Sequence, residues 1–179
     1  LGRQNWASIA SSKDGTVLVA AINPGLIYRS TNSGTDWLPV TSAGSKEWKS
    51  IAMSANGMTI AAAESNGGIW VSTNGGDDWV RTFTGDASWT SVAVTSDGSR
   101  GFATSNTGFY RATNLLASTV VWDSNLASSW TAVASSIDGE QVAASSTYHK
   151  RFYIWTSSNY GDSMIIKATT NGWRVVSLA

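Results

Sequence analysis

The sequence predicts an all-β fold of the β-propeller class, built from four-stranded antiparallel blades. A segment of about 41 residues repeats along the 179-residue chain, and every repeat contains a dipeptide suited to a tight hairpin turn. The composition fits short strands joined by polar turns, since the chain has ten Trp, only two Pro and 13% charged residues. The length suits one domain with a substantial core.

The repeat is visible in four segments that align without gaps and begin at Trp6, Trp48, Trp89 and Trp130. A fifth repeat begins at Trp173 and is cut off by the end of the chain. A β-helix would need shorter coils, and a helical repeat would need a 3.6-residue periodicity, so the period favours propeller blades. We expect blades at about 6–47, 48–88, 89–129 and 130–172, and the first strand of a fifth blade at 173–179.

Each repeat predicts four strands. Side chains after the opening Trp alternate between two faces, so that Ile51 and Met53 share one face, and the second strand is rich in Ala and Ser, which indicates closely packed sheets. We expect the opening Trp to fill the gap between adjacent blades rather than to stack on a sugar. The first strand ends in a pair that tolerates positive φ: Asp14-Gly15, Asn56-Gly57, Asp97-Gly98 or Asp138-Gly139.

A second turn motif lies between the third and fourth strands. Segment 30–37 reads STNSGTDW and segment 72–79 reads STNGGDDW. We call these two segments the box turns, because they resemble the Asp box of the BNR family, Ser-x-Asp-x-Gly-x-x-Trp, with Asn in the Asp position. The third repeat keeps only Thr113-Asn114 before an insertion, and the fourth has a weaker form ending in Met164. The candidate box residues are Ser30, Asn32, Gly34, Trp37, Ser72, Asn74, Gly76, Trp79, Ser157, Asn159 and Gly161.

The box residues predict a structural role rather than a ligand site. Short Ser and Asx side chains can hydrogen-bond the backbone nearby, Gly can supply positive φ, and the Trp can fold back as an apolar plug. The resemblance covers essentially the whole chain. It implies a propeller similar to sialidases or to photosystem II assembly factors, with the boxes at its periphery and away from the ligand-binding face.

The resemblance also implies where a ligand would bind. Loops between the second and third strands, and between one blade and the next, would share that face, and they include the segments 64–67, 85–88 and 105–107. Glu64 and Asp86 are the one plausible carboxylate pair there, but turns commonly carry such residues for solubility, and the arginine triad of sialidases is not evident. Arg29 and Arg111 precede the turns at the other end of the third strand. We therefore expect no catalytic residues.

The most distinctive exposed segment is predicted at Tyr148, His149, Lys150 and Arg151, whose aromatic and Arg composition suits a protein interface. The alternative is an ordinary solvated loop. His149 is the sole His and the chain has no Cys, so the sequence indicates no metal site and no cofactor.

Twelve basic and twelve acidic residues cancel, which argues against nucleic acid as a partner. No apolar run reaches the length of about 18 residues expected of a membrane span, so membrane insertion is not predicted. The resemblance favours a secreted or organelle-lumen location, because these families include secreted hydrolases and lumenal assembly factors.

The first and last segments of the chain both look cut in phase with the repeat. We expect either part of a larger propeller or an arc completed by a partner chain, with a closed four-bladed ring as the alternative. The expected function is a non-enzymatic scaffold that binds a protein partner or serves as a subunit of a larger assembly. Two alternatives stay open: a secreted glycan-binding or glycoside-hydrolase-like propeller, and a lumenal propeller similar to photosystem assembly factors.

Overall fold

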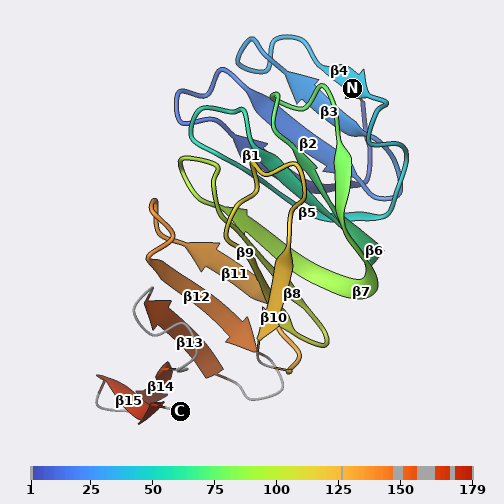
Figure 1. The fold of residues 1–179 in the computed structure, drawn as a ribbon. Coiled ribbons are helices and arrows are strands. Elements are labelled where there is room, and N and C mark those ends of the chain that lie inside the picture. Colours follow the sequence, from blue (N-terminus) through green and yellow to red (C-terminus); the bar gives the residue numbers. More distant parts are fainter. Residues whose placement is uncertain (1, 126, 147–150, 157–163, 170–171, 179) are drawn as a thin grey trace.

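The computed structural model describes residues 2–125, 127–146, 151–156, 164–169 and 172–178. These residues form antiparallel sheets and contain no helix, which confirms the predicted all-β class (Figure 1). Accordingly, no helix among them could cross a membrane. The first sheet follows the predicted order, with consecutive hairpins in the order β1-β2-β3-β4. Its strands are β1 (Trp6–Ser11), β2 (Leu18–Ile22), β3 (Ile27–Ser30) and β4 (Leu38–Val40).

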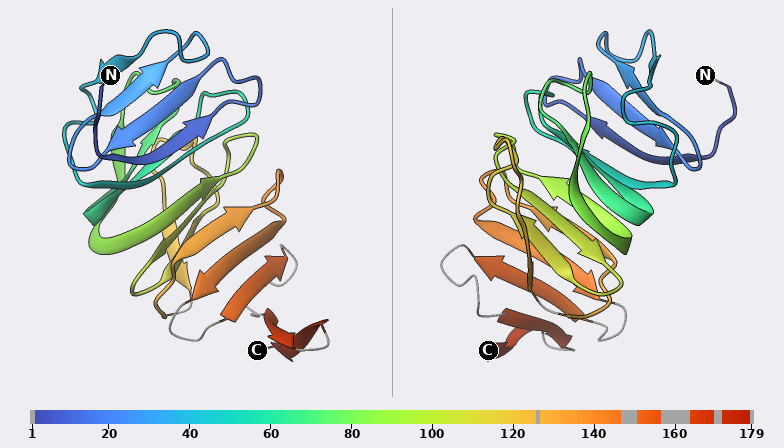
Figure 2. Two further views of the ribbon diagram at one scale, coloured as in Figure 1. Left: turned by 180° about the vertical axis from the view of Figure 1, so that it is seen from behind. Right: turned by 45° about the vertical axis from the view of Figure 1, so that its right-hand side comes forward.

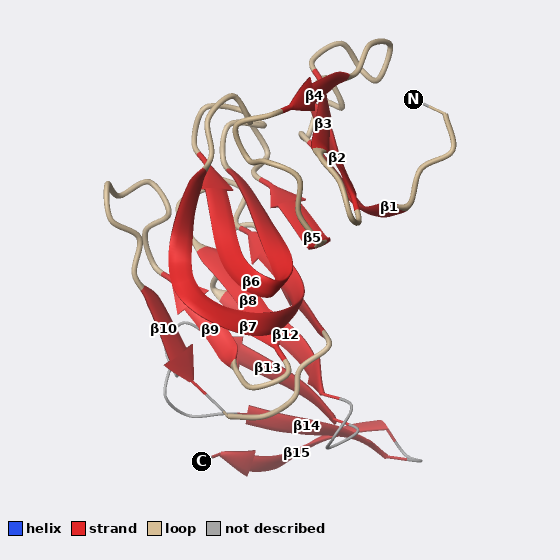
Figure 3. Ribbon diagram, turned by 90° about the vertical axis from the view of Figure 1, so that its right-hand side faces the viewer, coloured by secondary structure: helices blue, strands red, loops and turns tan. Residues whose placement is uncertain are grey.

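The second and third repeats form one continuous six-stranded sheet in the order β10-β9-β8-β7-β6-β5. Its strands are β5 (Trp48–Met53), β6 (Ile60–Ser72), β7 (Val80–Val94), β8 (Gly101–Ser105), β9 (Phe109–Ala112) and β10 (Trp122–Asn125). Strands β6 and β7 are long and curve together (Figure 3).

The curvature of β6 and β7 corrects one expectation. The loops predicted at 64–67 and 85–88 lie inside these strands and pair with each other, Ser65 with Ser88 and Gly67 with Ala87. The pairing shifts register at three places, which lets the strands bend instead of separating. Glycine within a strand is typical of such a bend.

The last sheet contains β11 (Ala132–Ser135), β12 (Gln141–Ser146), β13 (Arg151–Thr156), β14 (Met164–Thr169) and β15 (Gly172–Leu178). The sequence predicts the last segment as the opening strand of a further blade, but β15 pairs antiparallel with β14 as a fifth strand of this sheet. The pairing places Ala168 opposite Trp173 and Met164 opposite Leu178. A hairpin partner satisfies backbone groups that a separate strand would leave open.

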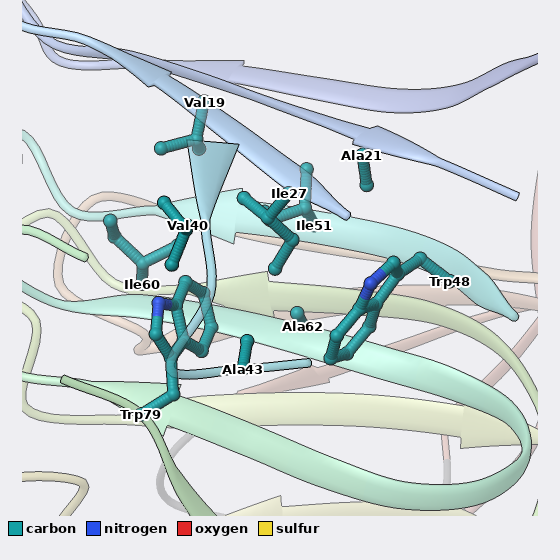
Figure 4. Packing of buried hydrophobic residues seen from close by; sticks show 10 residues of the cluster. All are labelled: Val19, Ala21, Ile27, Val40, Ala43, Trp48, Ile51, Ile60, Ala62 and Trp79. Carbon is teal, nitrogen blue, oxygen red and sulfur yellow. The ribbon is translucent and has the colours of Figure 1, made fainter. Parts of the chain in front are cut away.

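The sheets stack face to face in chain order, with the first and last at opposite ends (Figures 1 and 2). The predicted role of the opening Trp in packing is confirmed inside the stack, where Trp48, Trp89 and Trp130 are at most 2% exposed. Figure 4 shows Trp48 and Ile51 of β5 packed with side chains from the first sheet, including Val19 and Ala21. Trp6 differs, because 40% of it is exposed.

The turns that follow the first strand of each repeat share one geometry. Their Gly residues adopt the predicted positive φ, for example 74° at Gly15 and 77° at Gly98. A Ser or Thr two residues before the Asp or Asn completes the turn: Thr95 Oγ1 donates to Asp97 Oδ1 (2.6 Å) and accepts from the amide of Arg100 (3.0 Å). This hydroxyl is not among the turn residues predicted from the sequence.

Successive turns are also joined by backbone hydrogen bonds, which we call the turn ladder. The amide of Lys13 donates to the carbonyl of Ala55 (2.8 Å), that of Ala55 to Ser96 (2.9 Å), and that of Ser96 to Ile137 (2.9 Å). The four residues occupy the same position in successive repeats. The ladder therefore links every repeat to the next through one donor and one acceptor.

Candidate functional site

The strongest candidate site is a hollow on the predicted ligand face, where the second and third repeats meet. Its volume is about 270 Å³. Three of the segments predicted for this face, 64–67, 85–88 and 105–107, contribute to it, so the structure brings them together. The lining residues are Asn66, Asp86, Ala87, Ser88, Asn106 and Thr107. We call this feature the loop hollow.

The backbone of the loop hollow is held by bonds that cross between strands. Asn66 has a positive φ of 54°, and its side-chain oxygen accepts a hydrogen bond from Ser88 Oγ (2.5 Å). The Ser88 carbonyl accepts from the amide of Asn106 (3.1 Å). Beneath the hollow, the buried Trp89 indole donates to the carbonyl of Gly67 (2.7 Å). These bonds hold the polar lining groups in one preformed arrangement.

The two predicted carboxylates lie in different surroundings. Glu64 Oε2 accepts a hydrogen bond from the Trp70 indole (3.1 Å) and is not part of the lining of the loop hollow. Asp86 lines the loop hollow and forms an ion pair with Arg81 (2.8 Å). Because both side chains of this ion pair are substantially exposed, it contributes little stability but does orient Asp86. Each carboxylate therefore has its own partner within the bend of β6 and β7.

Arg81 is the site residue that sequence reasoning missed. It lies in β7, and its guanidinium donates both to Asp86 and to the carbonyl of Thr84 (3.4 Å). Gly68 makes room for it, since a Cβ at this position would collide with Arg81 Nε and would stand 2.6 Å from the Phe83 carbonyl. The pair Gly67-Gly68 inside an otherwise regular strand was the available signal for this close approach.

The box turns form closed networks of local hydrogen bonds. In the first, Ser30 Oγ accepts from the amide of Gly34 (2.9 Å), and Asn32 Oδ1 accepts from the amide of Asp36 (2.9 Å). The Trp37 indole donates to the Gly34 carbonyl (3.0 Å), so the ring folds back over the turn. The second box turn repeats these bonds at 2.9, 3.0 and 3.1 Å through Ser72, Asn74, Gly76, Asp78 and Trp79.

The second box turn also contacts the first sheet. Arg29 donates to the Gly75 carbonyl (2.8 Å) and forms an ion pair with Asp77 (2.6 Å). The third repeat, which lacks a box, buries Leu115 instead, and the Leu115 amide bonds the Ser99 carbonyl (2.7 Å). Arg29 therefore joins the first sheet to the second box turn and is not part of the loop hollow.

Several predicted residues lie outside the described residues, namely Tyr148, His149 and Lys150 of the predicted interface and Ser157, Asn159 and Gly161 of the weak fourth box. Arg151 opens β13 and pairs with Ser146. Within the described ranges no three His, Cys, Asp or Glu side chains are grouped so that they could hold a metal ion.

No protein-family model matches this sequence, and no curated protein matches it. Solved structures do resemble it. The WD40 repeats of RRP9 give a TM-score of 0.77 at 12% identity, covering 94% of this chain and 52% of that one. The β-propeller domain of Cps50 (Swd1) from Myceliophthora thermophila gives 0.72 at 12% identity, covering 88% and 54%. An ancestral GH74 enzyme gives 0.65 at 19% identity, covering 96% and 25%.

These similarities show the fold: the chain forms part of a β-propeller. It spans about half the length of the RRP9 repeats and of the Cps50 domain, and a quarter of the GH74 enzyme.

Proposed function

We propose that this chain is a non-enzymatic scaffold that binds a protein partner at the loop hollow, as a structural subunit of a larger assembly. The observation that carries the proposal is the separate engagement of the two carboxylates. Hydrolysis by a carboxylate pair needs both groups facing the bond to be cut, about 5 to 10 Å apart. Here Glu64 accepts a hydrogen bond from the Trp70 indole, and Asp86 forms an ion pair with Arg81.

A recognition role fits the groups that remain. Asn66, Ser88 and Asn106 offer amide and hydroxyl groups on a backbone that is already fixed, so these segments would lose little conformational entropy when a partner binds. The net charge of zero gives no long-range preference for a polyanion. The likeness in fold to WD40 repeats supports a scaffold role for the chain.

Affinity purification of the tagged chain from its native source, followed by binding of the recovered partner to variants, tests the proposal. Asn106→Arg places a long charged side chain in the loop hollow and should lower the affinity for the partner at least about 10-fold. Thr31→Arg is the matched control, because Thr31 is exposed on a box turn away from the loop hollow. Equal binding by both variants would remove the loop hollow as the partner site.

The alternative is a glycan ligand, with or without hydrolysis. It is separated by a glycan array and a hydrolase screen on the wild type, Glu64→Gln and Asp86→Asn. Both substitutions keep an oxygen acceptor for the Trp70 or Arg81 partner while removing the charge. Hydrolytic turnover by the wild type that either variant abolishes would overturn the non-enzymatic proposal.

A further inference from the structure

The outward side of the first sheet is apolar and uncovered. Trp6 is 40% exposed and Ile9 is 66% exposed, and together with Ala20 and Trp37 they line a hollow of about 460 Å³. The residues at the same repeat positions inside the stack are at most 9% exposed: Trp48, Trp89, Trp130, Ile51, Val92 and Val133. We call this surface the front face.

The structure shows what covers the equivalent surfaces of the later repeats. Val19 and Ala21 of β2 belong to the same buried cluster as Trp48 and Ile51. One repeat further on, Ala61 and Ala63 of β6 lie in one cluster with Trp89 and Val92. In each case the cover includes the second strand of the preceding repeat, and Phe102 of β8 lies in the same way in one cluster with Trp130 and Val133. Trp6 and Ile9 of the front face therefore correspond to residues that a preceding repeat covers elsewhere in the stack.

The turn of the first repeat is also uncovered, as the space around its glycine shows. A Cβ placed on Gly57 would stand 3.1 Å from Val17, and one placed on Gly139 would stand 2.7 Å from Thr95, in each case a side chain of the preceding repeat. A Cβ placed on Gly15 would meet nothing within 4 Å. The first turn has room for a neighbour that the later turns already possess.

The opposite end of the stack has the complementary features. Ala52 and Ala93 are partly buried against the repeat that follows them, whereas Ala134 at the same position of the fourth repeat is exposed. Ile137 is 79% exposed. Within the described ranges, the turn ladder leaves two backbone groups without a ladder partner, the amide of Ile137 and the carbonyl of Lys13. The Ile137 amide is a donor and the Lys13 carbonyl is an acceptor, so the two groups could form one more rung of the same kind.

We propose that the front face binds the far side of the last sheet, formed by the fourth repeat, in a second copy of this chain. The two copies meet head to tail, and the Ile137 amide of one donates to the Lys13 carbonyl of the other. Two such joints close a ring. The choice of a second copy rests on the match between two turns of one chain, because the turn of the first repeat offers an unmatched ladder acceptor and the turn of the fourth repeat an unmatched ladder donor. This surface is separate from the loop hollow.

Sedimentation velocity and native mass spectrometry of the full chain test the proposal. We expect a species of twice the 18.9 kDa chain mass. Ile9→Lys buries an unpaired charge in the joint and should weaken association more than about 100-fold. Val121→Lys is the control, since Val121 has the same 66% exposure but lies outside the front face. A wild-type chain that stays monomeric when its concentration is raised 100-fold would overturn the proposal. An Ile9→Lys variant that associates as strongly as the wild type would also overturn it.

A mixing experiment tests the head-to-tail arrangement. Ala134→Glu should block the far side as Ile9→Lys blocks the front face, so each variant alone should be monomeric. An equimolar mixture should form a dimer with one chain of each kind, because one intact joint remains. A front-to-front dimer predicts instead that Ala134→Glu associates like the wild type, and this result would refute the proposal. Partner binding at the loop hollow is unaffected by either outcome.

Hydrogen exchange provides a readout that needs no variant. Exchange of the Ile137 amide should slow as the chain concentration rises and the joint forms. Exchange of the Lys13 amide should not change, because that amide already donates to Ala55 within one chain. Exchange at Ile137 that is independent of association would contradict the proposed rung.

Discussion

Trp6 and Trp89 open two repeats of the same pattern, yet their surroundings differ. Trp89 is 2% exposed, packs edge-on against Phe83 and Tyr110 at 5.0 and 4.8 Å, and donates to the Gly67 carbonyl. Trp6 is 40% exposed and has one edge-on neighbour, Tyr28, at 5.9 Å. The residue type follows from the repeat, but its energetic contribution depends on whether a sheet lies on both sides.

The largest expected effect comes from removing these two rings. Trp89→Ala should lower the free energy of unfolding by about 3–5 kcal/mol, because it leaves a cavity among buried side chains. Trp6→Ala should cost only about 1–2 kcal/mol, since a large part of the ring is already in water. Denaturant unfolding at low protein concentration, where self-association is negligible, measures both. Equal losses would contradict the difference in environment.

The turn glycines should show a smaller difference. Gly98→Ala and Gly15→Ala impose nearly the same backbone strain, since φ is 77° and 74°. At Gly98, however, the new methyl group would also collide with Thr59 of the preceding repeat, whereas at Gly15 it would meet nothing. We expect Gly98→Ala to be the more destabilising by about 1–3 kcal/mol in the same unfolding measurement. If the Gly15 variant lost as much stability as the Gly98 variant, the prediction would be wrong, because another segment would then have to lie against the first turn.

The smallest effect concerns a feature that the turns of the first and third repeats should share. Hydrogen bonds from the Ser12 hydroxyl and the Thr16 backbone lower the pKa of Asp14 to about 2, and bonds from Thr95 and Ser99 lower the pKa of Asp97 to about 2. A lowered folded-state pKa stabilises the fold above the ordinary value of 3.8, and that contribution is lost as the pH falls through about 2.

Asp14→Asn and Asp97→Asn should therefore both flatten the loss of stability between about pH 4 and pH 2. Asn56 occupies the same place in the second repeat, so the turn accepts an amide. Unfolding midpoints at several pH values provide the measurement. A change in only one variant would show that neighbouring sheets, rather than the turn itself, set the pKa.

Most features that depend on residues close together in the chain could be predicted, but the Ser or Thr hydroxyl that completes each Asp-Gly turn was missed. The Asp-Gly turns and the hydrogen bonds of the box turns follow from a few residues at fixed spacing, whereas burial of the opening Trp also requires a sheet on both sides. Features that depend on how strands curve were missed, as with Arg81, whose contact with Asp86 requires the bend in β7. The pairing of β15 with β14 was also missed, because a repeat register predicts where a strand begins but not which edge it joins.

The turn ladder has a consequence for how such a chain can change in length. Each rung joins only consecutive repeats, so adding or deleting a whole repeat at one end leaves the other rungs intact. Unfolding of a terminal sheet would likewise break a single rung and one apolar contact surface, and the remaining sheets would keep theirs. The architecture is modular in this sense: each repeat is joined to the next by the same backbone rung, although the sheets themselves differ in strand number.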